Sequence, residues 1–103
     1  MTKGTLIVTS RPESPEQTDD YHRWYDETHF PEILAIDGFV TARRLANVDG
    51  ESFAAIYDVD DVEAAQGALT AAYAAGTMSP SVGVQQSPPP SVQWFTELAT
   101  PTG

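Results

Sequence analysis

Residues Phe39 to Asp58 have the sequence FVTARRLANVDGESFAAIYD, in which two strand-like segments flank a turn. Phe39–Leu45 and Phe53–Asp58 are short and contain the β-branched and aromatic side chains that are typical of strands. Between them, Asn47–Gly50 supplies the Asn, Asp and Gly residues that hairpin turns favour. The stretch therefore predicts an antiparallel β-hairpin in the middle of the chain.

A strand and a helical segment precede this hairpin. Thr5–Ser10 is β-branched and predicts the first strand. Ser14–Gln17 combines a capping serine, a proline at the first helical position and the glutamine of a capping box, which predicts a helix start. We expect this helix to run through Asp19 to about Thr28. Pro31 lacks an N–H and its ring clashes with the preceding turn, so the helix should kink or restart near His29 and Phe30, with a short helix to Ile36.

A second helix and a last strand follow the hairpin. Asp60 or Asp61 can cap an Ala-rich helix that runs to about Ala75, and Gly76 is typical of a helix end. Residues 77–90 hold four prolines among Ser and Gly residues, which predicts an irregular loop. Ser91–Leu98 alternates like a fourth strand, and residues 99–103 form a tail.

The predicted order βαββαβ is that of a ferredoxin-like α+β fold, in which a four-stranded antiparallel sheet carries two helices on one face. The length of 103 residues predicts one domain over residues 1–103. Both faces of the predicted sheet are apolar, with Phe39, Phe53 and Tyr57 on one and Val40 and Ile56 on the other. A second copy of the chain would cover the free face, so we expect a homodimer.

Composition narrows the possible partners. The formal net charge is -10, which opposes binding to nucleic acid or to an anionic membrane surface. The chain contains no cysteine, so disulfides and thiol nucleophiles are excluded. The first residues lead directly into a short strand rather than into a signal or membrane segment, so we expect a cytoplasmic protein without a membrane partner.

Titratable and aromatic residues concentrate between Tyr21 and Arg44. These 24 positions hold both histidines, one of the two tryptophans, two of the four tyrosines and three of the five basic residues. An α-helical projection places Tyr21, Trp24, Tyr25 and Thr28 on the face toward the sheet. The same projection aligns His22 with His29 and puts Asp26 beside both. The region therefore predicts a site for a small molecule at the edge of the buried helix face.

His29 has two interpretations. It is a general acid or base tuned by Tyr25 or Asp26, or it is a packing histidine that bonds to a backbone carbonyl freed by Pro31. His22 has the same two interpretations, but it lies nearer to the solvent-exposed start of the helix. A metal site formed by His22, Asp26 and His29 is a further alternative, although the spacing is not that of a known zinc motif and we expect no metal.

Arg43 and Arg44 are adjacent in a predicted strand, so they should point to opposite faces. One should be exposed or paired, and the other should reach an interior site or the dimer interface. We expect Arg43 to stabilise negative charge on a substrate. A structural ion pair with Glu27 or Glu32 is the alternative.

The chain resembles a known family in this region. WYDETHFPEIL at Trp24–Leu34, then Gly38-Phe39 and Ala42-Arg43-Arg44, is similar to the pattern WYD-x-EH-x-P-x-x-L…PGF…A-x-R of small bacterial EthD-like proteins in the dimeric α/β-barrel superfamily. The likeness covers about the first 60 residues. Asp37 replaces the usual proline, and Thr28 stands where glutamate is common. The resemblance implies a homodimeric barrel, a cleft between helices and sheet, and a functional role for His29.

Together these observations predict an enzyme without an organic cofactor or haem that transfers a proton on a small, hydrophobic, oxygenated metabolite of aromatic or polyketide-like type. The reaction would be a cyclisation, an isomerisation or a lyase-type elimination. The alternatives are a cofactor-free quinone-forming monooxygenase and a non-catalytic binding protein. The expected catalytic residues are His29, Tyr25 and Arg43, and the expected substrate-binding residues are His22, Trp24, Asp26, Phe39, Tyr57 and Trp94.

Overall fold

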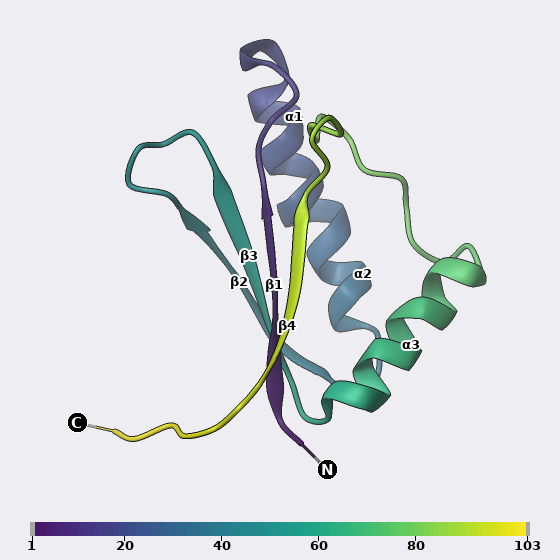
Figure 1. Cartoon of the computed structure of the whole chain (residues 1–103). Helices are drawn as coiled ribbons and strands as arrows, with labels where there is room; N and C mark the ends of the chain where they lie inside the picture. The colour runs from purple at the N-terminus through teal and green to yellow at the C-terminus, as the bar shows by residue number, and fades with distance from the viewer. Residues whose placement is uncertain (1, 103) are drawn as a thin grey trace.

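A computed structural model describes residues 2–102. The chain forms one four-stranded antiparallel sheet in the order β2-β3-β1-β4, with two helical segments on the same face (Figure 1). The strands are β1 (Gly4–Ser10), β2 (Phe39–Ala46), β3 (Phe53–Val59) and β4 (Ser91–Thr96). The predicted α+β class and βαββαβ order are confirmed, and the topology fits the ferredoxin-like plan.

The first helical segment changes its geometry along its length. It begins as the 3₁₀ turn η1 (Pro15–Gln17) and continues as α1 (Thr18–Arg23), the π-helix η2 (Trp24–His29) and α2 (Phe30–Leu34) without interruption. The predicted restart of the α-helix near His29 and Phe30 is confirmed, but the change begins earlier, at Trp24. The predicted capping box is wrong, because the Ser14 side chain makes no capping hydrogen bond.

The π-helix lies directly before the turn that contains Pro31. Proline cannot donate a backbone hydrogen bond and crowds the carbonyl one turn before it, so regular α-helical hydrogen bonding is disturbed there. The Phe30 N–H bonds to the Tyr25 carbonyl, five residues back, where an α-helix would use a residue four back. A helix with wider turns projects its side chains in different directions from an α-helix, and this decides where His29 points.

The second helix, α3 (Val62–Ala74), is capped as predicted. The Asp61 carboxylate accepts a hydrogen bond of 3.0 Å from the Ala64 N–H, and Gly76 beyond its end has a positive φ of 74°. Within residues 2–102, no helix is both long and apolar enough to cross a membrane.

The core lies between the sheet and the helices. Leu6 is the centre of the inner sheet face, paired with Tyr57 on β3 and with Trp94 on β4. Leu6 and Tyr57 are almost fully buried, as are Tyr21 and Ile33 from the helices. The outer face carries no helix, and Ile7, Ile56 and Phe95 lie on it (Figure 1).

Candidate functional site

A cavity of about 330 Å³ lies between the inner sheet face, the helices and the chain that links α3 to β4. We call it the central cavity. Its walls are mostly apolar and come from three parts of the fold. The first helical segment contributes Trp24, Tyr25, His29 and Ile33; the sheet contributes Leu6, Val8, Tyr57 and Val92; α3 and the following chain contribute Leu69, Tyr73, Ser81, Val84, Gln86 and Pro90.

His29 is buried in the wall of the central cavity, with only 8% of its surface exposed. Its ring stacks on Trp24, with centroids 4.5 Å apart and planes inclined by 21°. The rings of Tyr25 and Tyr57 meet it edge-on at 5.4 Å and 6.2 Å. Trp24 and His29 are five positions apart, so the wider π-helical turn is what brings both rings to one face.

The environment of His29 keeps its imidazole neutral. Burial lowers the pKa of His29 to about 4, and the carboxylate of Glu32 opposes this only weakly. The Nδ1 atom is buried without a hydrogen-bond partner, so nothing in the described part of the chain fixes the tautomer. His29 is thus a neutral group at physiological pH, free to accept or donate a hydrogen bond.

Tyr25 and Tyr57 also border the cavity, but neither hydroxyl bonds to His29. The Tyr25 hydroxyl bonds to Ser10 Oγ at 3.1 Å, and Ser10 in turn bonds to the Tyr21 hydroxyl at 2.6 Å. The Tyr57 hydroxyl is buried without a partner. Burial raises the pKa of both Tyr25 and Tyr57, so both remain protonated near neutral pH.

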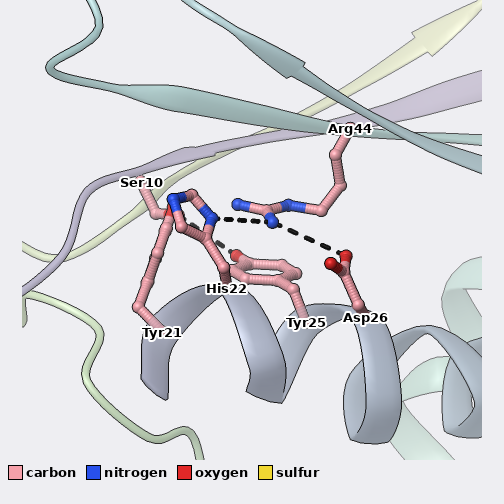
Figure 2. Close-up of polar contacts among 6 residues, drawn as sticks. All are labelled: Ser10, Tyr21, His22, Tyr25, Asp26 and Arg44. Carbon is pink, nitrogen blue, oxygen red and sulfur yellow. Dashed lines mark hydrogen bonds and ion pairs between the residues drawn. The ribbon is translucent and has the colours of Figure 1, made fainter. Parts of the chain in front are cut away.

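His22 and Asp26 form a separate cluster around Arg44. Arg44 Nη1 donates to His22 Nδ1 at 3.0 Å and lies 3.6 Å from the Asp26 carboxylate, while the guanidinium lies 4.5 Å above the Tyr25 ring (Figure 2). Since arginine only donates, His22 accepts through Nδ1. Burial and the positive charge of Arg44 lower the pKa of His22.

The structure separates residues that the α-helical projection had grouped. His22 and Asp26 contact Arg44, whereas His29 faces the central cavity, so Asp26 does not tune His29. Among residues 2–102, no three potential metal ligands lie together, and the alternative of a site built from His22, Asp26 and His29 is therefore not supported.

The expectation for Arg43 needs correction. Arg43 and Arg44 do point to opposite faces, but Arg43 is exposed and pairs with Ile56 on the outer face, whereas Arg44 pairs with Ala55 on the inner face. A β-bulge between Phe39 and Thr41 shifts the alternation along β2. Arg43 therefore does not reach the cavity.

Two of the expected binding residues belong to the core rather than to the cavity wall. Phe39 is buried against Tyr57, with ring centroids 6.2 Å apart, and Trp94 packs against Phe39 at 6.3 Å. Of the expected site residues, those that line the cavity are Trp24, Tyr25, His29 and Tyr57.

The wall formed by the chain between α3 and β4 was not predicted from the sequence, which indicated only an irregular loop there. Glu32 on α2 fixes this segment by accepting hydrogen bonds from the Ser79 N–H at 2.9 Å and from Ser79 Oγ at 2.6 Å. Val84 forms a β-bridge with Pro12. Beside it, the Glu13 N–H donates a hydrogen bond of 2.7 Å to the Gly83 carbonyl. These contacts hold residues 79–86 against the helices as the third wall of the cavity.

Gly83 shows how closely that wall approaches the helix. Its φ is 72°, and a Cβ atom at this position would lie 3.1 Å from the carbonyl oxygen of Gln17. Another residue would therefore be strained in its backbone and crowded by its neighbours. Glycine is the residue that permits this contact.

A comparison of the chain with models of known families, with curated proteins and with solved structures finds no match.

Proposed function

We propose that the protein is a cofactor-independent enzyme that transfers a proton on a small, largely apolar, oxygenated molecule bound in the central cavity. A cyclisation, an isomerisation or a lyase-type elimination fits this chemistry. The observation that carries the proposal is the position of His29 in the cavity wall, neutral and without a protein partner. The EthD-like resemblance of the residues around His29 adds support.

The low pKa of His29 sets how it would act. A neutral imidazole can accept a proton, but a base with a pKa of about 4 is weak toward an isolated substrate. Removal of a proton from a bound substrate leaves an imidazolium beside an anion. Their attraction is stronger beside mostly apolar walls than in bulk water, and it raises the pKa of His29 during the reaction.

Neighbouring groups have supporting roles in this proposal. Trp24 holds the imidazole plane by stacking, and the protonated hydroxyl of Tyr57, which has no protein partner, is a candidate donor to a substrate oxygen. Tyr25 is a positioning residue, because Ser10 engages its hydroxyl and its ring contacts the edge of His29.

A second candidate is a non-catalytic binding protein. The low pKa of His29 and the lack of a hydrogen-bond partner for its Nδ1 atom favour hydrogen bonding over proton transfer. In that case the cavity would hold an oxygenated ligand without changing it.

Deuterium exchange distinguishes these two candidates. β-Tetralone is a neutral bicyclic ketone with exchangeable carbon-bound protons, and its exchange in heavy water can be followed by proton NMR. The enzyme proposal predicts saturable acceleration by the native protein, which β-naphthol inhibits by competition. Binding of β-tetralone measured by calorimetry, with exchange no faster than in the presence of heat-denatured protein, would instead support the binding protein.

We further propose that the functional unit is a homodimer in which the outer sheet faces meet. Phe95 is 47% exposed and Leu45 43% exposed on this face, and Ile7 and Ile56 lie between them on the central strands. Burial of such a surface is favourable by about 25 cal/mol for each Å² of apolar area. A second copy is the simplest cover for it.

A further inference from the structure

We infer that the central cavity selects uncharged ligands and discriminates against carboxylates, and that the absence of a cation from its wall determines this selectivity. The inference deepens the proposed function, since it concerns the same site and names the class of molecule that the site admits.

The lining residues contain no Asp, Glu, Lys or Arg. Arg44 is not among the lining residues; its guanidinium lies over the Tyr25 ring and is engaged by His22 and Asp26, as Figure 2 shows. Its charge acts on Tyr25 and Tyr57 by lowering their pKa against the larger effect of burial, but the guanidinium makes no contact in the cavity. Arg43 lies on the other face of the sheet. An anion entering the cavity would therefore lose its hydration without gaining a positive partner, which is strongly unfavourable.

The ionisable groups of the wall do not supply a positive charge either. Burial favours the neutral imidazole of His29 and the protonated hydroxyls of Tyr57 and Tyr73. Each of these groups is neutral near pH 7. They can exchange hydrogen bonds with a carbonyl, ester or phenol, but they do not neutralise a carboxylate.

A fixed negative charge lies on α2, next in sequence to the lining residue Ile33. Ser79 holds the Glu32 carboxylate through two hydrogen bonds, and these bonds lower the pKa of Glu32, so it is ionised at neutral pH. Its field reaches the wall, because it raises the pKa of both His29 and Tyr73. Together with the net charge of -10, this charge repels anions from the cavity.

The remaining polar atoms suit a neutral, oxygenated ligand. Gln86 is exposed in the wall, and its amide makes long hydrogen bonds of 3.5 Å to Ser81 Oγ and 3.4 Å to the Val84 carbonyl. Such contacts are easily exchanged for a ligand oxygen. The site thus combines apolar walls with a few neutral hydrogen-bonding groups, which is the usual composition of a site for a neutral small molecule.

A matched pair of ligands tests this inference. β-Naphthol and β-naphthoate share a ring system, but only the second is an anion at neutral pH. We expect calorimetry on the native protein to show that β-naphthol binds at least about tenfold more tightly. Binding of β-naphthoate with equal or higher affinity, or no binding of either compound, would overturn the inference.

An added cation should reverse the preference. Gln86→Arg introduces a guanidinium into the wall and should strengthen β-naphthoate binding by about tenfold or more relative to β-naphthol. Gln66→Arg on the exposed surface of α3 makes the same change in net charge outside the wall and should alter neither affinity. Equal gains in both variants would contradict a local origin of the selectivity.

These measurements record binding rather than turnover, so they separate the two proposals. If the protein prefers β-naphthol but does not accelerate the exchange of β-tetralone, the inferred selectivity for uncharged ligands is supported and the enzyme proposal fails. If exchange is accelerated while β-naphthoate binds as tightly as β-naphthol, the selectivity fails and the enzyme proposal stands.

Discussion

His29 stacks on Trp24 across one π-helical turn, with ring centroids 4.5 Å apart, and this contact turns the imidazole toward the central cavity. In a regular α-helix, residues five apart lie on different faces and their rings would not meet. The π-helical turn before Pro31 therefore decides which way the imidazole points.

The burial of His29 predicts a pH dependence of stability. The unfolded chain takes up the His29 proton below about pH 6.5, whereas the folded protein takes it up only near pH 4. The stability that depends on neutral His29 is thus fully present above pH 6.5 and is lost as the pH falls toward 4. Since one pKa unit corresponds to about 1.4 kcal/mol, the loss should be about 3 kcal/mol.

Urea unfolding of the native protein and of His29→Gln across this range measures the effect. Glutamine does not titrate, so the difference between their free energies of unfolding should shrink by the predicted amount as the pH falls. A difference that stays constant with pH would show that His29 is not desolvated as the structure indicates.

Arg44 should contribute more to stability than an ordinary surface arginine. Its side chain is 14% exposed, stacks on Tyr25 and donates to His22. We expect Arg44→Ala to lower the free energy of unfolding by about 1–3 kcal/mol. Arg23, whose side chain is 62% exposed beside Asp20, provides the control, and Arg23→Ala should change stability by less than about 0.5 kcal/mol. Equal effects in thermal or urea unfolding would contradict this assignment.

Ser10 should be the most sensitive member of the hydroxyl cluster. Ser10→Ala leaves the hydroxyls of Tyr21 and Tyr25 without their common partner and should cost about 1–3 kcal/mol. Tyr25→Phe leaves Ser10 still bonded to Tyr21 and should cost less than Ser10→Ala in the same unfolding experiment. The reverse order would mean that the cluster does not depend on Ser10.

The proposed dimer predicts a difference between two surface variants. Analytical ultracentrifugation should show a dimer for the native chain at micromolar concentration. Phe95→Glu on the outer sheet face should dissociate it, whereas Leu34→Glu, at a position of similar exposure on α2, should not. A native chain that sediments as a monomer would refute the dimer.

Local patterns were sufficient to predict the sheet and both helices. The turn at Asn47–Gly50, the cap at Asp61 and the glycine after α3 each act within a few residues, so they can be recognised from the sequence. The same holds for the change in the first helical segment, which Pro31 determines.

The site was harder to predict because it depends on which face of a helix or strand each side chain points to. The π-helix rotates His29 away from His22, and the bulge after Phe39 places Arg44 rather than Arg43 on the inner face. One extra residue in a turn or a strand reverses such assignments. Pro31 signals that the helix changes but not that it becomes a π-helix, and no sequence pattern marks the bulge. The third wall depends on contacts such as Glu32 with Ser79, 47 residues apart, which no local pattern encodes.

The most direct test of the proposed function is the rate of deuterium exchange into β-tetralone catalysed by His29→Gln, with His22→Gln as the matched control. Glutamine retains a polar side chain but cannot take up a proton at these pH values. The account predicts that His29→Gln lowers the rate by roughly 10²–10⁴-fold while binding of β-naphthol persists, and that His22→Gln retains most of the rate. A near-native rate in His29→Gln would contradict the account and leave the central cavity as a binding site only.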